Sequence, residues 1–338
     1  MSLSEIKNTL ENKLQKEVLS IEQLPQSGSS RKNYIVTTSE AKYVLTENDN
    51  LLENDSFYYF SAVFSNLKLN TPEIIWISED RKTYLQSYLG GQTFSEIIAN
   101  EGDSERVKSL VKQTLEKLYE LQVKTQGKVD YKKTFEYESY NEIPVLHDLF
   151  YFKFMFADVL EVYYHKTRLV KEFQKLVSEI EQLKPKGLMI RDFQARNIMV
   201  DENDTVFFID YQSAMQGPLM YDVTSFLFQA KANFSDDFRS EMLSHYYQLW
   251  GNSDAQIQLQ KQLIPMKLMR FLQVLGVYGF RGLVQQKSHF IKSIPQGIEN
   301  LYQLSESWEE MGQYPELKSV INQLYQPEIK AKLQAMIP

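Results

Sequence analysis

Hydrophobic positions near the N-terminus follow two different periods. Apolar residues at near-fourfold spacing predict helices, whereas β-branched and aromatic runs between small-residue turns predict strands. The expected elements, in chain order, are a helix at residues 4–18, strands at 33–37 and 42–46, a helix at 53–67, and strands at 73–77 and 83–88. We therefore expect a small N-terminal lobe built on an antiparallel sheet.

Residues 89–91, Leu-Gly-Gly, break the last of these strands, and the pattern beyond them is mainly helical. The clearest helical stretches are residues 107–122 and 146–180, and helical spacing returns from Tyr221 to the C-terminus. One dense β insertion interrupts this pattern, with strands expected at 188–190, 198–200 and 206–209. The second part of the chain is therefore expected to be a larger, mainly helical lobe.

The length of the chain favours two lobes. Single cores usually stop growing near ~250 residues, and this chain has 338. We place the boundary at the Leu-Gly-Gly break, which gives lobes at residues 1–88 and 89–338. The expected class is α+β.

Composition narrows the range of partners and compartments. The net charge of -7 argues against nucleic acid or an anionic membrane as the main partner, because both are bound through clustered Lys and Arg. The chain has no cysteine, which excludes disulfides, thiolate metal sites and a cysteine nucleophile and fits a reducing cytoplasm. It shows neither a signal peptide nor an apolar run of the ~18 residues that a membrane span needs. We expect a soluble, cytoplasmic, monomeric protein.

Three oxygen-bearing side chains mark the ends of the predicted strands in the β insertion. Asp192 and Asn197 lie between two strands in a D-x4-N arrangement, and Asp210 follows thirteen residues after the Asn. Phosphoryl transfer needs a carboxylate to orient and deprotonate the attacking hydroxyl, and hard oxygen ligands for Mg²⁺. Asp192 suits the first role, and Asn197 and Asp210 suit the second. The alternative is that all three cap turns, which are common positions for these residues.

The segments around these residues resemble the aminoglycoside phosphotransferase-like branch of the protein-kinase fold. Within it, the chain is most similar to bacterial kinases that act on the anomeric hydroxyl of N-acetylmuramate or N-acetylglucosamine. The likeness is strongest at residues 190–200, 207–227 and 270–295, and weaker at 52–60 and 72–90. It implies a two-lobe fold with ATP bound by residues 1–88, and a catalytic loop and acceptor site in 89–338. It also implies that Asp222 braces the site, although a helix N-cap would explain this residue equally well.

Two positions depart from the family pattern. Ile190 stands where the family usually has a histidine, and Thr46 stands where a strand lysine usually holds the nucleotide phosphates. Arg31 or Lys32 could supply the missing charge from the preceding loop, whose amides at Gly28 and Ser29 would face the phosphates. A surface hairpin with solvated charges is the alternative.

The resemblance also implies where the substrates bind. Backbone groups from Gln86 to Tyr88 would read the adenine edge. Candidate acceptor residues lie next to the catalytic Asp and the metal-binding Asp, and they are Gln194, Arg196, Tyr211 and Gln212. Amide and guanidinium groups suit sugar hydroxyls and acetamido or lactyl groups, although loop residues often brace the backbone instead.

The sequence therefore favours an ATP- and Mg²⁺-dependent kinase that phosphorylates an amino sugar. One alternative keeps the fold and changes the acceptor to an aminoglycoside, choline or another small alcohol, for which an acidic acceptor pocket would be expected. A second alternative is a pseudokinase that binds nucleotide without chemistry, as Thr46 and Ile190 suggest. Retention of the Asp192, Asn197 and Asp210 trio speaks against this last possibility.

Overall fold

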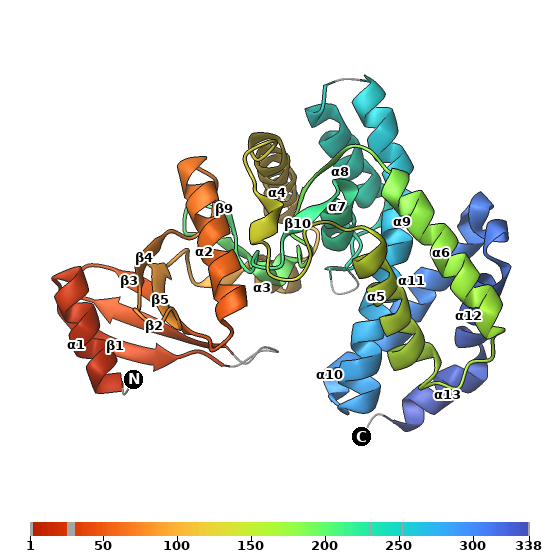
Figure 1. Cartoon of the computed structure of the whole chain (residues 1–338), viewed down its shortest axis with the longest axis horizontal. Helices are drawn as coiled ribbons and strands as arrows, with labels where there is room; N and C mark the ends of the chain where they lie inside the picture. The colour runs from red at the N-terminus through yellow and green to blue at the C-terminus, as the bar shows by residue number, and fades with distance from the viewer. Residues whose placement is uncertain (1–2, 26–30, 230–231, 252, 337–338) are drawn as a thin grey trace. The chain divides into compact units, whose positions relative to one another are not determined.

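The computed structural model describes residues 3–25, 31–229, 232–251 and 253–336 of the chain. It divides into two compact units (Figure 1). The first unit comprises Met1–Glu138 and Ile190–Ala214, and the second comprises Ser139–Met189 and Met215–Pro338. The loop that carries the catalytic candidates therefore belongs to the same unit as the N-terminal sheet. The predicted functional boundary between residues 88 and 89 stays a prediction.

A five-stranded antiparallel sheet forms the centre of the first unit. Its strands are β1 (Val18–Gln23), β2 (Lys32–Thr38), β3 (Lys42–Glu47), β4 (Ile74–Ile77) and β5 (Thr83–Ser87), in the order β1-β2-β3-β5-β4. Helix α1 (Leu3–Leu14) packs Ile6 and Leu10 into a core with Val36, Leu45 and Leu85 from the sheet. The predicted antiparallel lobe is confirmed.

The first helix is shorter than predicted, and the strand after it was not predicted. Helix α1 ends at Leu14, and Gln15 has a φ of 53°, in the left-handed region that ends helices. Val18, which fits the helical spacing in sequence, instead begins β1 and pairs with Thr38. A single buried valine satisfies both patterns, so spacing alone could not separate them.

Helix α2 (Leu51–Asn66) follows the sheet hairpin and matches the predicted aromatic helix. The side chain of Asn50 caps it by accepting a hydrogen bond from the backbone N–H of Glu53. Its buried aromatic side chains include Phe57, which lies 5.1 Å from Tyr84 of β5 between ring centroids. The helix is thus fixed by its cap at one end and by aromatic packing along its length.

The rest of the first unit includes the loop that carries the catalytic candidates. It contains β6 (Gln92–Thr93), α3 (Phe94–Glu101), α4 (Glu105–Lys124), η1 (Tyr131–Lys133), η3 (Ala195–Asn197), β8 (Ile198–Val200) and β9 (Val206–Phe208). Strands β6, β8 and β9 form a small antiparallel sheet. Gly90 has a φ of 108°, and a Cβ there would lie 2.7 Å from the carbonyl oxygen of Val200. Only glycine fits at this position, where the Leu-Gly-Gly segment contacts the backbone of β8.

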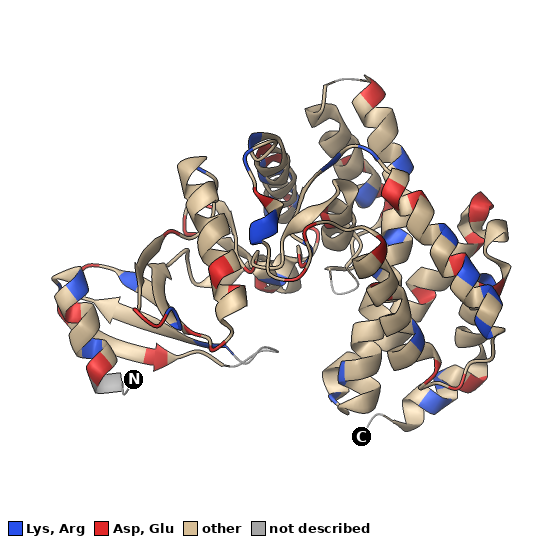
Figure 2. Cartoon of the chain, viewed as in Figure 1, with Lys and Arg blue, Asp and Glu red and all other residues tan. Residues whose placement is uncertain are grey.

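The second unit is mainly helical. Strands β7 (Lys186–Met189) and β10 (Met215–Pro218) pair with each other. The helices are α5 (Glu142–Phe152), η2 (Lys153–Ala157), α6 (Lys166–Gln182), α7 (Met220–Leu227), α8 (Asp236–Leu249), α9 (Ser253–Tyr278), η5 (Gly279–Val284), α10 (Ser288–Ile291), α11 (Ile294–Ser307), η6 (Glu309–Gln313), α12 (Pro315–Leu324) and α13 (Pro327–Ala335). Helix α6 carries both basic and acidic residues (Figure 2).

Two predictions for this region were wrong in detail. The helical stretch expected at 146–180 breaks between η2 and α6, where Glu161 has a φ of 61° and His165 caps the new helix. The three strands expected as one insertion belong to two sheets, because β7 pairs with β10 whereas β8 and β9 pair with β6. Pairing partners are set by contacts that are distant in sequence, and a local pattern does not contain them.

Helix α9 and its continuation, Ser253–Val284, are long and apolar enough to cross a membrane by length and composition, which the sequence analysis did not anticipate. Core helices of soluble proteins pass the same test. Within its unit, α9 packs against α5, α7 and α11. These contacts bury part of its apolar surface within the unit.

Candidate active site

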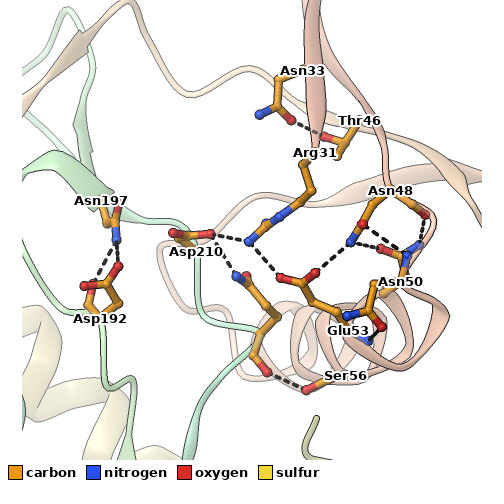
Figure 3. Close-up of polar contacts among 12 residues, drawn as sticks. Arg31, Asn33, Thr46, Asn48, Asn50, Glu53, Ser56, Asp192, Asn197 and Asp210 are labelled. Atoms are coloured by element: carbon orange, nitrogen blue, oxygen red, sulfur yellow. Dashed lines mark hydrogen bonds and ion pairs between the residues drawn. The ribbon is translucent and has the colours of Figure 1, made fainter. Parts of the chain in front are cut away.

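The three predicted site residues meet at one end of the β8–β9 pair. Asn197 immediately precedes β8, and Asp210 lies two residues after β9. Ile198 faces Phe208 in the ladder, and the backbone N–H of Ile209 donates to the carbonyl of Asn197 at 3.0 Å. This register sets Asn197 and Asp210 at the same end of the paired strands β8 and β9 (Figure 3).

Asp192 and Asn197 are joined directly. The Asn197 amide nitrogen donates to the backbone oxygen of Asp192 at 2.9 Å and to its carboxylate Oδ2 at 3.2 Å. Because these bonds occupy the nitrogen, the amide oxygen is directed away from Asp192. The D-x4-N spacing therefore yields a buried amide that fixes the carboxylate and offers an oxygen as a ligand.

Asp210 is held in an unusual backbone conformation. Its φ is 64°, which a non-glycine residue keeps only where the surroundings fix it. Its Oδ1 accepts hydrogen bonds from Arg31 at 3.0 Å and from Gln212 at 2.9 Å. Within the described parts of the chain, Oδ2 has no hydrogen-bond partner. Asp210 thus has one oxygen fixed by protein donors and one available to a cation.

These donors fit Mg²⁺. Magnesium prefers oxygen ligands and is usually held by one or two carboxylates together with substrate phosphates, so it does not require a large protein cage. Among the residues that the structure describes, no cluster of three or more His, Cys, Asp and Glu side chains could hold a metal. Asn197 and Asp210 would hold a magnesium ion, which would neutralise charge on the transferred phosphoryl group.

Gln194 and Arg196 lie against Asp192 itself. A guanidinium nitrogen of Arg196 is 2.7 Å from Oδ2 of Asp192, and the Gln194 amide donates to Oδ1. Both residues therefore adjoin the group that would receive the proton of an attacking hydroxyl. Their predicted contact with the acceptor stays a prediction, and the position beside Asp192 suits it.

Tyr211 is placed differently from what its sequence position suggested. The side chain is fully buried, its hydroxyl lies 2.7 Å from Oγ of Ser61 on α2, and its ring stacks on Phe57 with centroids 5.1 Å apart. Burial raises the pKa of the Tyr211 hydroxyl above its usual range. We therefore propose that Tyr211 anchors the loop to α2, in place of the acceptor contact predicted from sequence.

Gln212 braces Asp210. Its side chain is 5% exposed, its amide nitrogen donates to Asp210, and its backbone oxygen accepts from Ser56 of α2 at 2.7 Å. Its Oε1 is buried without a hydrogen-bond partner in the described structure. Because its amide nitrogen is bound to Asp210, Gln212 is placed to position that carboxylate. The contact with the acceptor predicted for Gln212 stays a prediction.

A cluster of charged side chains that sequence reasoning missed joins Asp210 to α2. Nη2 of Arg31 lies 2.9 Å from Oε1 of Glu53, and the Asn48 amide donates to the other oxygen of Glu53 at 2.9 Å (Figure 3). Burial lowers the pKa of Arg31, but Asp210 and Glu53 together outweigh it and raise the pKa above its usual value. Arg31 is therefore a fixed positive charge. The only signal for Glu53 in the sequence was its place as an acidic residue in the first turn of the predicted aromatic helix.

Thr46, at the position of the missing lysine, is neutral and buried. It is 1% exposed, and its hydroxyl donates to Asn33 at 2.8 Å. It pairs with Tyr84 across β3 and β5, where burial raises the pKa of Tyr84 to about 12. No cation occupies this position of β3.

The remaining candidates are less well defined by the structure. Gly28 and Ser29 lie outside the described residues. Gln86 pairs with Val44 and Ile74 on its two sides in the sheet, whereas Tyr88 lies beyond the end of β5. Backbone groups near Tyr88 are therefore better placed than those of Gln86 to read an adenine edge, which stays a prediction.

Ile190 and Asp222 are both buried. Ile190 is buried, as expected for an apolar residue that repacks the loop in place of histidine. Asp222 is fully buried in the first turn of α7, and Leu219 rather than Asp222 occupies the N-cap position. The capping alternative for Asp222 is therefore excluded, and its bracing role stays a prediction.

The chain is similar to known phosphotransferases in sequence. Residues 20–257 match the model of the phosphotransferase enzyme family. The N-acetylmuramate/N-acetylglucosamine kinase of Neisseria meningitidis serogroup B is 22% identical over 251 residues, which cover 72% of this chain and 73% of the relative.

Solved structures share the fold. The choline kinase LicA from Streptococcus pneumoniae superposes with a TM-score of 0.60 at 15% identity, covering 89% of this chain and 98% of its own. A thermostable mutant of aminoglycoside phosphotransferase APH(4)-Ia, in a ternary complex with ADP and hygromycin B, gives a TM-score of 0.59 at 15% identity, covering 90% and 99%. These similarities confirm the kinase-like α+β fold predicted from sequence. With the family model matching most of its length, this chain belongs to the phosphotransferase enzyme family.

Proposed function

We propose that the chain is a small-molecule kinase that transfers the terminal phosphoryl group of ATP, with Mg²⁺, to a hydroxyl of an amino sugar such as N-acetylmuramate or N-acetylglucosamine. The observation that carries the proposal is the convergence of Asp192, Asn197 and Asp210 at one edge of the β8–β9 pair. The Neisseria relative supports the acceptor class.

In this proposal each residue of the trio has a distinct task. Asp192 would accept the proton of the attacking hydroxyl, and Asn197 would hold the carboxylate in place while its oxygen binds the metal. Asp210 would supply the second metal ligand, with Gln212 fixing its orientation. Catalysis would then rest on positioning and charge stabilisation, which is what phosphoryl transfer requires.

The side chains around Asp192 favour a hydroxylated acceptor that is neutral or anionic. Gln194 offers an amide and Arg196 a guanidinium, whereas a cationic acceptor would be better served by carboxylates. Choline and aminoglycosides remain the alternative, since proteins of both activities share the fold. We further propose a monomer in the cytoplasm that acts without nucleic acid or membrane.

The test is ADP release over a panel of N-acetylmuramate, N-acetylglucosamine, choline and hygromycin B, with the wild type, Asp192→Asn and Glu202→Gln. Asp192→Asn should lower kcat by roughly 10²- to 10⁴-fold with little change in the Kd for ADP. Glu202→Gln is the matched control, because it alters an exposed carboxylate in the turn between β8 and β9.

Each outcome separates the candidates. Preference for choline or hygromycin B would favour the cationic acceptors. Nucleotide binding without turnover on any substrate would support the pseudokinase alternative. Full activity of Asp192→Asn would end the kinase assignment.

A further inference from the structure

The first unit lacks a cation at the strand position where kinase-like enzymes usually carry one. Thr46 occupies that position in β3, and its hydroxyl is committed to Asn33. A phosphotransferase that binds a nucleotide still needs positive charge beside the phosphates. If the proposed function is correct, this charge must come from another element.

Arg31 reaches the same face of the sheet from the neighbouring strand. The register sets Lys32 opposite Glu47 and Asn33 opposite Thr46, and Arg31 directly precedes this ladder. Because side chains alternate between faces, Arg31 shares a face with Asn33 and therefore with Thr46. Lys32 points to the opposite face and is exposed. The structure thus separates the two candidates that the sequence left open.

The guanidinium of Arg31 is positioned by a chain of contacts from helix α2. Glu53 holds it at 2.9 Å, and Asn48 in turn holds Glu53. The side chains of Arg31 and Glu53 are only 16% and 18% exposed, so solvent screens this pair less than a surface pair. In protein kinases the strand lysine forms an ion pair with a glutamate of the following helix. Arg31 and Glu53 form a pair of the same kind from different residues.

The same nitrogen of Arg31 lies 3.0 Å from Oδ1 of Asp210. A magnesium ion held by Asp210 would neutralise charge on the β- and γ-phosphates of the nucleotide. A cation that contacts a metal-binding carboxylate therefore stands next to those phosphates. Arg31 leaves Oδ2 of Asp210 to the metal, so the two cations need not compete for one oxygen.

We propose that Arg31 binds the β-phosphate of the nucleotide and so replaces the missing strand lysine, and that Glu53 is the residue that positions it. This inference rests on the proposed function and deepens it, because it names how the site holds its nucleotide. Arginine suits the task, since its planar guanidinium can donate two parallel hydrogen bonds to one phosphate.

The decisive measurement is the Kd of ADP and of AMP by isothermal titration calorimetry in the presence of Mg²⁺. Arg31→Ala should weaken ADP binding by roughly 10- to 100-fold, the range expected for losing a charged hydrogen bond. AMP, which has no β-phosphate, should lose less than about threefold. Glu53→Gln should show the same ADP-selective pattern at a smaller amplitude of roughly 3- to 10-fold, because it misplaces the cation without removing it.

Two control variants remove comparable charges elsewhere. Arg81→Ala breaks an ion pair to Asp55 of the same helix, with a nitrogen–oxygen distance of 2.6 Å, and Lys32→Ala removes the charge next to Arg31. Both should leave the ADP-to-AMP affinity ratio at the wild-type value. Should Arg31→Ala fail to fold, Arg31→Lys keeps the charge and should lose roughly 3- to 10-fold in ADP affinity with AMP unaffected.

The outcomes distinguish this inference from the proposed function. An unchanged ADP-to-AMP ratio in Arg31→Ala, or in Arg31→Lys if only that variant folds, would show that Arg31 merely balances the charge of Asp210 and Glu53. The kinase assignment would survive that result as long as the wild type turns over. A wild type that binds no nucleotide would instead defeat the proposed function.

Discussion

Replacing Tyr211 by phenylalanine tests whether this residue is a packing anchor or part of the acceptor site. Oγ of Ser61 donates to the backbone oxygen of Phe57 at 2.7 Å, so the Tyr211 hydroxyl is the donor in its 2.7 Å contact with Ser61. The phenylalanine ring keeps the stacking on Phe57 and loses the hydrogen bonds of the hydroxyl, to Ser61 and to Thr71. The expected loss of unfolding free energy is about 0.5–1.5 kcal/mol.

Urea denaturation with fluorescence detection measures this loss, and a double-mutant cycle with Ser61→Ala assigns it to the pair. The cycle should give a coupling of about 1 kcal/mol, and the KM for the acceptor should change by less than about threefold. A normal stability accompanied by a large rise in the acceptor KM would refute the packing role and restore Tyr211 to the acceptor site.

Two further perturbations probe the scaffold. Gly90→Ala should destabilise the first unit by about 1–3 kcal/mol or more in urea denaturation, because alanine disfavours a φ of 108° and its Cβ would meet the carbonyl of Val200; wild-type stability would contradict this contact. Burial and the neighbouring Arg239 lower the pKa of Lys267 to about 8. The unfolded chain therefore binds more protons than the folded chain between about pH 8 and pH 10.5, and stability should rise with pH across this window by at most about 3 kcal/mol. Lys267→Met should flatten that rise in a pH series of urea midpoints, and an unchanged slope would rule out Lys267 as its source.

The arrangement of Asp192, Asn197 and Asp210 was predictable because its geometry is local. Asp192 and Asn197 are joined within one loop, and the turn between β8 and β9 sets Asp210 opposite them, so sequence spacing contained most of the arrangement. The same holds for the hairpin of β2 and β3 and for α2, whose patterns are strong and short in range.

The contacts around these three residues could not be predicted, because they join residues that are far apart in the sequence. Arg31 and Asp210 are 179 positions apart, and Tyr211 and Ser61 are 150 apart. No local period encodes such pairs. The position of Tyr211 next to Asp210 suggested a contact with the acceptor, whereas a partner on α2 allows the whole side chain to be buried.

The left-handed backbone at Asp210 has a consequence for how this position should be mutated. An alanine introduced there would remove the carboxylate and also strain the main chain, so lost activity would mix chemistry with misfolding. Asparagine tolerates this conformation far better than alanine and keeps an oxygen of similar reach. Asp210→Asn is therefore the substitution that isolates the negative charge as a variable.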